Sequence, residues 1–177
     1  MNRQITLIVT TLALLCLGVA VPAGDASAQQ KQRVSYKVTA ENSKYTQQQF
    51  LDVGDVPGHQ VRSYEIYRSF PNNAPVVNGM KIKETWTRGY SDYINGNGTS
   101  TTYGVMVMEN GDKIFTRSAL VAQSDESGKL TVIAAGPITG GTGKFAGIQG
   151  LTRSITKADP KAGFNEVDSV LEYWIDK

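Results

Sequence analysis

Residues 138–150 read Ile-Thr-Gly-Gly-Thr-Gly-Lys-Phe-Ala-Gly-Ile-Gln-Gly, and this glycine-rich stretch is the most specific segment of the chain. A phosphate-binding loop needs Gly-x4-Gly-Lys-Ser/Thr, whereas Lys144 is followed here by Phe145. A dinucleotide fingerprint opens a helix, and no helical pattern follows. Glycines permit tight turns and close backbone approach, and a phenylalanine between them can plug an interior. We therefore expect an architectural element formed by Gly140, Gly141, Gly143, Phe145, Gly147 and Gly150.

On both sides of this stretch, strand patterns alternate with turn signals. The pairs Asn95-Gly96 and Asn110-Gly111 predict tight hairpins, because Asn and Gly tolerate positive φ angles. Residues 47–52 predict one helical turn at most. Regular strand and turn spacing over a whole chain indicates a sandwich or a barrel, and an eight-stranded barrel has room for side chains or one small ligand. The eight expected strands are 33–41, 61–70, 80–88, 99–108, 113–123, 130–135, 151–157 and 166–175.

The glycine-rich stretch resembles the signature loop of allene oxide cyclases and plant dirigent proteins. That signature reads Thr-Gly-Gly-(Thr/Ser/Ala)-Gly-x-Phe-x-Gly-x-x-Gly, and residues 139–150 meet every fixed position. Residues 53–57, Val-Gly-Asp-Val-Pro, are similar to a second, looser stretch of the cyclases. The resemblance implies an all-β fold, a closed eight-stranded antiparallel barrel that is commonly trimeric and encloses an elongated apolar cavity.

Cyclase activity depends on a glutamate in the first strand, followed two residues later by an asparagine. Alignment with that strand puts Lys37 at the glutamate and Thr39 at the asparagine, and a second cyclase asparagine falls near Gln60. A lysine cannot replace the carboxylate, because its charge is reversed and it is normally protonated. We therefore do not expect allene oxide cyclase activity. Lys37, Thr39, Gln60 and Trp86 remain candidate ligand-binding residues.

Three residues are candidates for chemistry inside such a cavity. Glu84 lies between Ile82 and Trp86 on one predicted strand face, where burial would raise its pKa and make it a general acid or base. Arg117 could pair with Glu84 or bind an anionic head group, and Tyr103 could supply a hydroxyl. The alternative for each is an exposed residue or a structural partner.

The first 28 residues have the form of a cleaved signal peptide. Residues 5–21 are apolar and uncharged, and Ala26-Ser27-Ala28 supplies the small-x-small pattern of a cleavage site. Cleavage leaves residues 29–177 as one domain, exported to the periplasm or secreted. It also removes Cys16, so the mature chain has no disulfide, thiol nucleophile or thiolate metal ligand.

The remaining composition narrows the function further. His59 is the only histidine, which argues against a metal centre or a Ser-His-Asp triad, and the net charge of +2 without a basic block gives no support for nucleic-acid binding. Several strands carry apolar residues on both faces, which predicts a homo-oligomer, plausibly a trimer. We expect an exported barrel that binds a small apolar or amphiphilic molecule without a cofactor. The alternatives are a cyclase, isomerase or dirigent-type guide, and a structural oligomer with a filled barrel.

Overall fold

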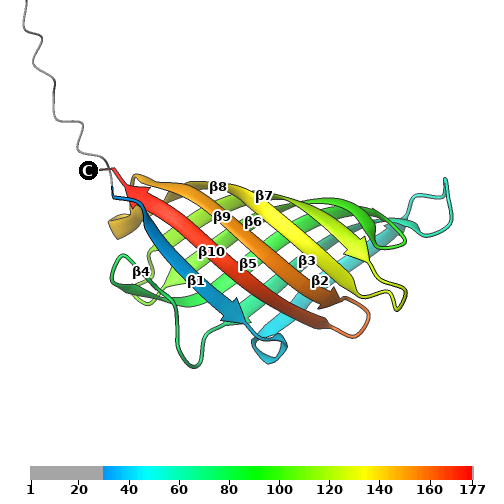
Figure 1. Cartoon of the computed structure of the whole chain (residues 1–177), viewed down its shortest axis with the longest axis horizontal. Helices are drawn as coiled ribbons and strands as arrows, with labels where there is room; N and C mark the ends of the chain where they lie inside the picture. Colours follow the sequence, from blue (N-terminus) through cyan, green and yellow to red (C-terminus); the bar gives the residue numbers. More distant parts are fainter. Residues whose placement is uncertain (1–29, 177) are drawn as a thin grey trace, which may run out of the picture.

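A computed structural model describes residues 30–176, and most of them lie in strands of an antiparallel sheet (Figure 1). The expected signal peptide, residues 1–28, lies outside this described part. No α-helix occurs among the described residues, and the two short 3-10 turns are η1 (Ala40–Asn42) and η2 (Gly143–Phe145). The strands are β1 (Gln32–Val38), β2 (Ser43–Asp52), β3 (His59–Ser69), β4 (Val76–Val77), β5 (Met80–Ile94), β6 (Asn97–Met108), β7 (Lys113–Ser124), β8 (Leu130–Gly141), β9 (Ile148–Asp159) and β10 (Phe164–Ile175).

The sheet is one long antiparallel path that curls around an interior (Figure 1). The strand order is β1-β10-β9-β8-β7-β6-β5-β3-β2, and the short β4 pairs with β5. The two ends of the path, β1 and β2, are consecutive in the chain and are separated only by η1. Beside η1, the Ser43 hydroxyl on β2 donates to the Asn165 side-chain oxygen on β10 at 3.1 Å. One end strand, β2, therefore contacts β10, the neighbour of the other end strand.

A bulge in β5 decides which of its side chains face the interior. Ile82 is fully buried, but the pairing with β6 shifts register between Ile82 and Glu84. Thr85 is therefore the next buried residue, and Glu84 and Trp86 lie on the outer face. The expectation that Ile82, Glu84 and Trp86 share one face was wrong, because the extra residue of a bulge reverses the two-residue period.

One end of the interior is filled by an apolar cluster. Phe145 of the glycine-rich stretch is completely buried there, packed among Ile82, Met108, Ile114 and Tyr173. This buried position is the one expected of a phenylalanine that plugs the interior. The cluster is completed by Val77, Met106, Ile138, Ile148 and Leu171.

The glycine-rich stretch is hydrogen-bonded to the hairpin between β6 and β7. Gly143 adopts a φ of +55°, and a Cβ there would lie 2.0 Å from the Asp112 carboxylate. The missing side chain lets this carboxylate accept a hydrogen bond from the Lys144 amide at 3.0 Å, which lowers the pKa of Asp112. The loop is also shorter than expected, since β8 and β9 extend into the stretch as far as Gly141 and Ile148.

The hairpin predicted at Asn95-Gly96 is present in the structure, whereas the helical turn considered for residues 47–52 is not. The Asn95-Gly96 hairpin between β5 and β6 is confirmed, with φ angles of +51° and +80°. Residues 47–52 were expected to form a helical turn, but they belong to β2 and pair with β3. Three consecutive glutamines hide the alternation of this strand, and a register shift between Tyr45 and Gln47 interrupts it.

Candidate functional site in the interior

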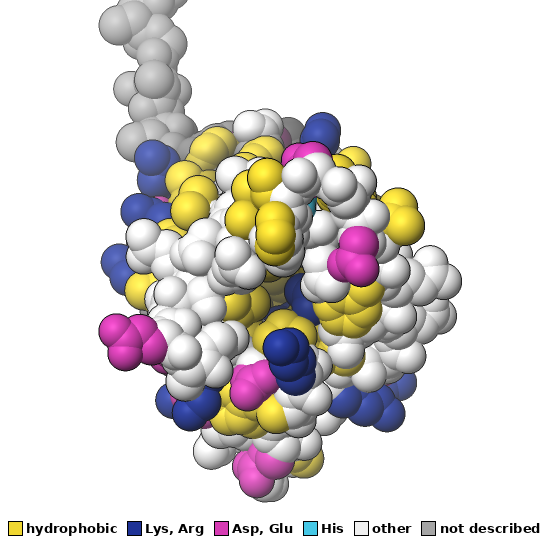
Figure 2. Space-filling model, turned by 90° about the vertical axis from the view of Figure 1, so that its right-hand side faces the viewer, with side chains coloured by type: hydrophobic (Ala, Val, Ile, Leu, Met, Phe, Trp, Pro, Cys, Tyr) yellow, Lys and Arg dark blue, Asp and Glu magenta, His cyan; other side chains and the backbone are white. Residues whose placement is uncertain are grey.

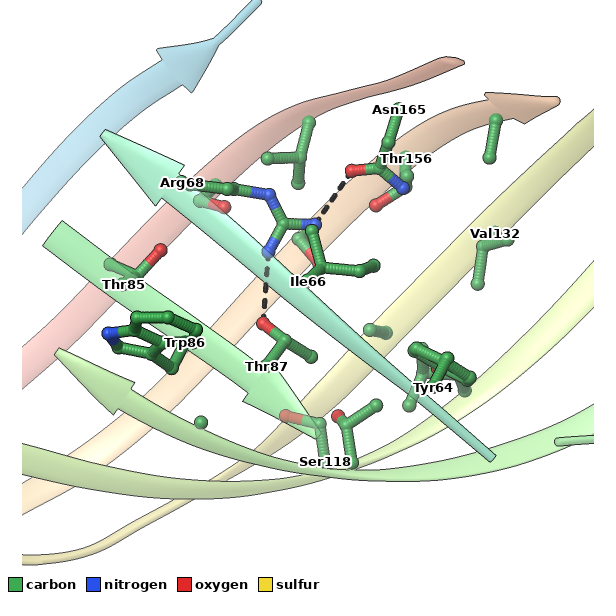
Figure 3. A pocket seen from close by; sticks show the side chains of 18 of the residues that line it. Tyr64, Ile66, Arg68, Thr85, Trp86, Thr87, Ser118, Val132, Thr156 and Asn165 are labelled. Carbon is green, nitrogen blue, oxygen red and sulfur yellow. Dashed lines mark hydrogen bonds between the residues drawn. The ribbon is translucent and has the colours of Figure 1, made fainter. Parts of the chain in front are cut away.

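Beyond the apolar cluster the interior holds a cavity of about 120 Å³, shown from close by in Figure 3. Its wall is rich in hydroxyl groups, because several strands turn serine or threonine, rather than an aliphatic residue, toward the interior. Two arginines and four tyrosines complete its polar character. The hydroxyl-bearing residues are Thr85, Thr87, Thr102, Thr116, Ser118, Thr152, Ser154, Thr156 and Ser169, and the tyrosines are Tyr36, Tyr45, Tyr64 and Tyr93.

Arg68 of β3 places a positive charge inside this cavity. Its side chain is held across the interior, with Nη1 donating to the Thr87 hydroxyl at 2.9 Å and Nη2 donating to the Asn165 side-chain oxygen at 2.8 Å (Figure 3). Only 8% of the residue is exposed, and its Nε–H has no hydrogen-bond partner among the described residues. Burial lowers the pKa of Arg68, but a guanidinium stays protonated in proteins. The cavity therefore contains a buried cation.

Arg62 lies on the same face of β3, nearer the other end of the interior. Its Nη1 donates to the Gln48 side-chain oxygen at 3.2 Å, and its guanidinium lies 4.5 Å from the centre of the Tyr64 ring and 5.5 Å from that of Phe50. Such cation–π contacts partly offset the cost of burial. The residue is 7% exposed, and its Nε–H also has no partner in the described part of the chain.

Three of the interior tyrosines keep their protons at neutral pH. Burial raises the pKa of Tyr36 and of Tyr64, and it raises the pKa of Tyr93 to about 12. The Ser100 hydroxyl donates to the Tyr90 carbonyl, so the Tyr64 hydroxyl, 3.1 Å away, is the donor to Ser100. These three tyrosines are therefore neutral hydroxyls and do not neutralise the arginines.

The lack of a side chain at Gly89 leaves the space that the Tyr64 ring occupies. These residues are opposite each other on β5 and β3, and a Cβ at Gly89 would lie 2.3 Å from Cζ of Tyr64. No backbone strain is involved, only the space that the ring occupies. Any side chain at position 89 would push the tyrosine toward the cavity.

The cavity lies beneath an open mouth at the end of the molecule away from Phe145. A pocket of about 530 Å³ occupies this mouth, and Arg62, Tyr93 and Leu130 line both it and the inner cavity. Figure 2 views the molecule from the mouth side and shows a hollow in which basic side-chain atoms are visible. Arg62 therefore lies between the inner cavity and solvent, and Arg68 lies deeper.

The candidates from the cyclase alignment are spread over different parts of the molecule. Gln60 lines the mouth and donates to the Asp52 carboxylate at 2.7 Å. Lys37 lies on the outer face of β1 in an ion pair of 2.8 Å with Glu166. Thr39 lies in the turn after β1, where its hydroxyl donates to Glu41. Only Gln60 therefore adjoins the interior.

The three candidates for chemistry lie on the outer surface. Glu84 accepts a hydrogen bond from the Trp86 indole at 3.1 Å, and the Trp86 ring, which also borders the cavity, contacts Tyr67. Arg117 is opposite Tyr103 on neighbouring strands, with its guanidinium 5.6 Å from the tyrosine ring. The register puts Glu84 and Arg117 at different levels of the sheet, so the structure does not bring them together.

Sequence reasoning missed the two arginines and Asn165, although one signal was visible. Residues 62–68 alternate strictly, which places Arg62, Tyr64, Ile66 and Arg68 on a single face. A face that carries aromatic and aliphatic residues together with two arginines is ambiguous between an interior and an exterior. Only the burial of these residues in the folded sheet shows that this face points inward.

His59 forms a separate cluster beside the mouth. Its Nδ1 lies 2.6 Å from the Asp55 carboxylate and its Nε2 lies 2.7 Å from that of Asp92. Both nitrogens can donate only in the imidazolium, so the two carboxylates raise the pKa of His59, with Asp92 contributing most. The described residues contain no group of histidine, cysteine and acidic side chains placed to hold a metal ion. The cluster therefore ties the turn after β2 to β5 through a charged histidine.

This cluster predicts a pH-dependent stability. Because the pKa of His59 is higher in the folded chain than in the unfolded one, its contribution is complete below about pH 6.5 and is lost as the pH rises through the folded value. We expect the melting temperature of the wild type to fall over that window relative to His59→Gln. Melting curves at closely spaced pH values measure the difference, and parallel profiles for the two proteins would contradict this role.

Comparisons with known proteins give little further information. No protein-family model and no curated protein matches the chain. Among solved structures, the chain is similar to one described as pyocyanin demethylase, with 16% identity and a TM-score of 0.42 over 79% of this chain and 99% of the other. Within the described part of the chain, no helix is long and apolar enough to span a membrane.

Proposed function

We propose that this chain is an exported, closed eight-stranded barrel that binds a small amphiphilic molecule in its interior. The contact between Ser43 and Asn165 at the ends of the sheet supports closure. In a closed barrel, β1 and β2 act as one bent strand between β10 and β3, which makes eight strands with β3 and β5 to β10.

The observation that carries this proposal is the difference between the two ends of the interior. One end is packed with apolar side chains, whereas the other holds an unfilled cavity lined by hydroxyls and arginines beneath an open mouth. A purely structural barrel is better stabilised by an apolar filling, because each buried polar group must be hydrogen-bonded. An apolar cavity of about 150 Å³ holds benzene, so the inner cavity of about 120 Å³, which opens into the mouth, is close to the size of one ring.

The lining favours binding over acid–base catalysis. The described residues around the inner cavity include no aspartate, glutamate or histidine, and Tyr36, Tyr64 and Tyr93 are held protonated by burial. A general base near neutral pH is usually a histidine or a carboxylate with a shifted pKa. The enzyme alternatives, a cyclase, isomerase or dirigent-type guide, therefore receive less support from this geometry than a binding function does.

Native mass spectrometry of protein purified from its own host tests the proposed function. We expect the wild type to retain a small molecule, and we expect Ser118→Phe, which fills the inner cavity, to lose it. The matched control is Ala119→Phe, whose side chain points outward from the same strand and should leave retention unchanged. No retained molecule, together with no thermal shift across a panel of small acids, amides and alcohols, would contradict the function.

We also propose that the barrel forms a homo-oligomer through an outer apolar row. Val121, Ile133 and Ile155 are neighbours on β7, β8 and β9, and they are 57%, 60% and 51% exposed. A continuous apolar patch of this kind is typical of an interface. We expect Ile133→Glu to reduce the molar mass measured by light scattering to that of a monomer, whereas Thr131→Glu on the same strand face should not. An unchanged mass for Ile133→Glu would place any interface elsewhere.

A further inference from the structure

The interior arginines lack the counter-charges that most outer arginines have. On the outer face, Arg88 forms an ion pair with Glu65 at 2.8 Å, and Arg153 forms one with Glu172. Arg62 and Arg68 form no ion pair with any described residue, although both are more than nine-tenths buried. A buried charge without a partner is costly, which makes an anion the natural occupant of the cavity.

Arg68 is also placed to hold such an anion. Thr87 and Asn165 fix its two terminal nitrogens, and Asn165 is itself held by Ser43 and, through its amide nitrogen, by the Tyr45 hydroxyl at 3.3 Å. The Nε–H is enclosed by the protein, so the terminal N–H groups that Thr87 and Asn165 leave unused are the donors available to a ligand. A guanidinium presents its donors in one plane, which matches a carboxylate, and a fixed guanidinium loses little entropy when it binds.

The size and lining of the cavity restrict the rest of the ligand. The inner space holds about one ring. The tyrosine wall beside it already carries ring contacts, since Tyr45 and Tyr64 meet edge to face with centres 6.4 Å apart and Arg62 covers Tyr64. A long alkyl chain would instead cover serine and threonine hydroxyls without bonding to them. A lone inorganic anion would leave the aromatic wall without contact.

From these observations we infer that the interior site binds a small aromatic carboxylate, with the carboxylate on Arg68 and the ring along the wall of Tyr45, Tyr64 and Arg62. The inference rests on the proposed function and names the chemical class of its ligand. The open mouth supplies a path from solvent to Arg68, and Arg62, which lines both the mouth and the inner cavity, lies on that path.

Isothermal titration calorimetry with benzoate and benzamide tests the inference, because the two molecules have nearly the same shape and differ in charge. We expect benzoate to bind the wild type at least about tenfold more tightly than benzamide, as expected for a charge-assisted hydrogen bond. Arg68→Met should remove this preference, and Arg68→Lys, which keeps the charge but not the planar fork, should retain part of it. The outer-face control Arg88→Met should behave as the wild type.

Each contrary result has a distinct meaning. Equal binding of benzoate and benzamide, or a preference that survives in Arg68→Met, would overturn the anion class. Sulfate or decanoate binding more tightly than benzoate would replace the aromatic acid with an inorganic anion or an alkyl acid. Binding of none of these probes would also overturn the inference. The native mass spectrum of the host-purified protein reports a bound molecule of any charge, so it distinguishes failure of this inference from failure of the proposed function.

Discussion

Replacing Arg68 by methionine is expected to stabilise the empty protein while it removes the anion site. The methionine fills a similar length of space without placing a charge in the interior, and replacing buried ionic groups by apolar ones often stabilises by about 1–4 kcal/mol. Asn165 keeps its hydrogen bond from Ser43, and the Thr87 hydroxyl can bond to cavity water. Urea unfolding should therefore give a free energy of unfolding higher by about 1–3 kcal/mol.

The control for this experiment is Arg88→Met, which removes an exposed ion pair with Glu65 on the outer face. Exposed pairs contribute about 0–1 kcal/mol, so this variant should change little. Loss of more than about 1 kcal/mol in Arg68→Met would show that the cation supports the fold, and the argument for a missing counter-charge would fail. The expected result is a trade of stability for binding, as is common at functional sites.

Phe145→Ala is expected to have the largest effect on stability. Phe145 is completely buried in the cluster that fills the closed end, and phenylalanine-to-alanine changes in a core cost about 3–5 kcal/mol. The free energy of unfolding, measured by urea denaturation, should fall by that amount. The control is Phe164→Ala, because Phe164 is 40% exposed beside the β9–β10 turn. This change should lower the free energy of unfolding far less.

Benzoate affinity of the folded fraction provides a second readout for Phe145→Ala. Phe145 lies in the apolar cluster and is not among the residues that line the arginine cavity, so the affinity should be close to that of the wild type. A stability cost below about 1 kcal/mol would show that the apolar end is not closed by this residue.

The parts of the fold that could be predicted from the sequence are those set by local chemistry. The Asn95-Gly96 turn has positive φ angles at both residues, which few other residue pairs tolerate, so it was visible at once. The bulge after Ile82 and the strand character of residues 47–52 were not, because both depend on the partner strands. One bulge was enough to move Glu84 from the expected interior to the outer surface.

The candidate site was hidden for a different reason. In most small domains an apolar strand face is the buried one, and that rule was used to choose Glu84 and Arg117. Here the inward positions of β5 include Thr85 and Thr87, while the outward ones include Trp86. Because the cavity is polar, hydroxyl-bearing side chains face inward on this strand, which is the reverse of the usual rule. The same inversion explains why Arg68 was overlooked in a strand that had been recognised.

The central claim is that Arg68 is an internal binding group for a carboxylate, and its Nε–H resonance tests this claim most directly. In a ¹H–¹⁵N spectrum assigned with Arg68→Met, benzoate is expected to shift this resonance, because the terminal N–H groups of the same guanidinium gain a carboxylate acceptor. Benzamide should have a much smaller effect. Shifts confined to outer-face arginines such as Arg88 and Arg153, with the Arg68 resonance unchanged at saturating benzoate, would contradict the claim.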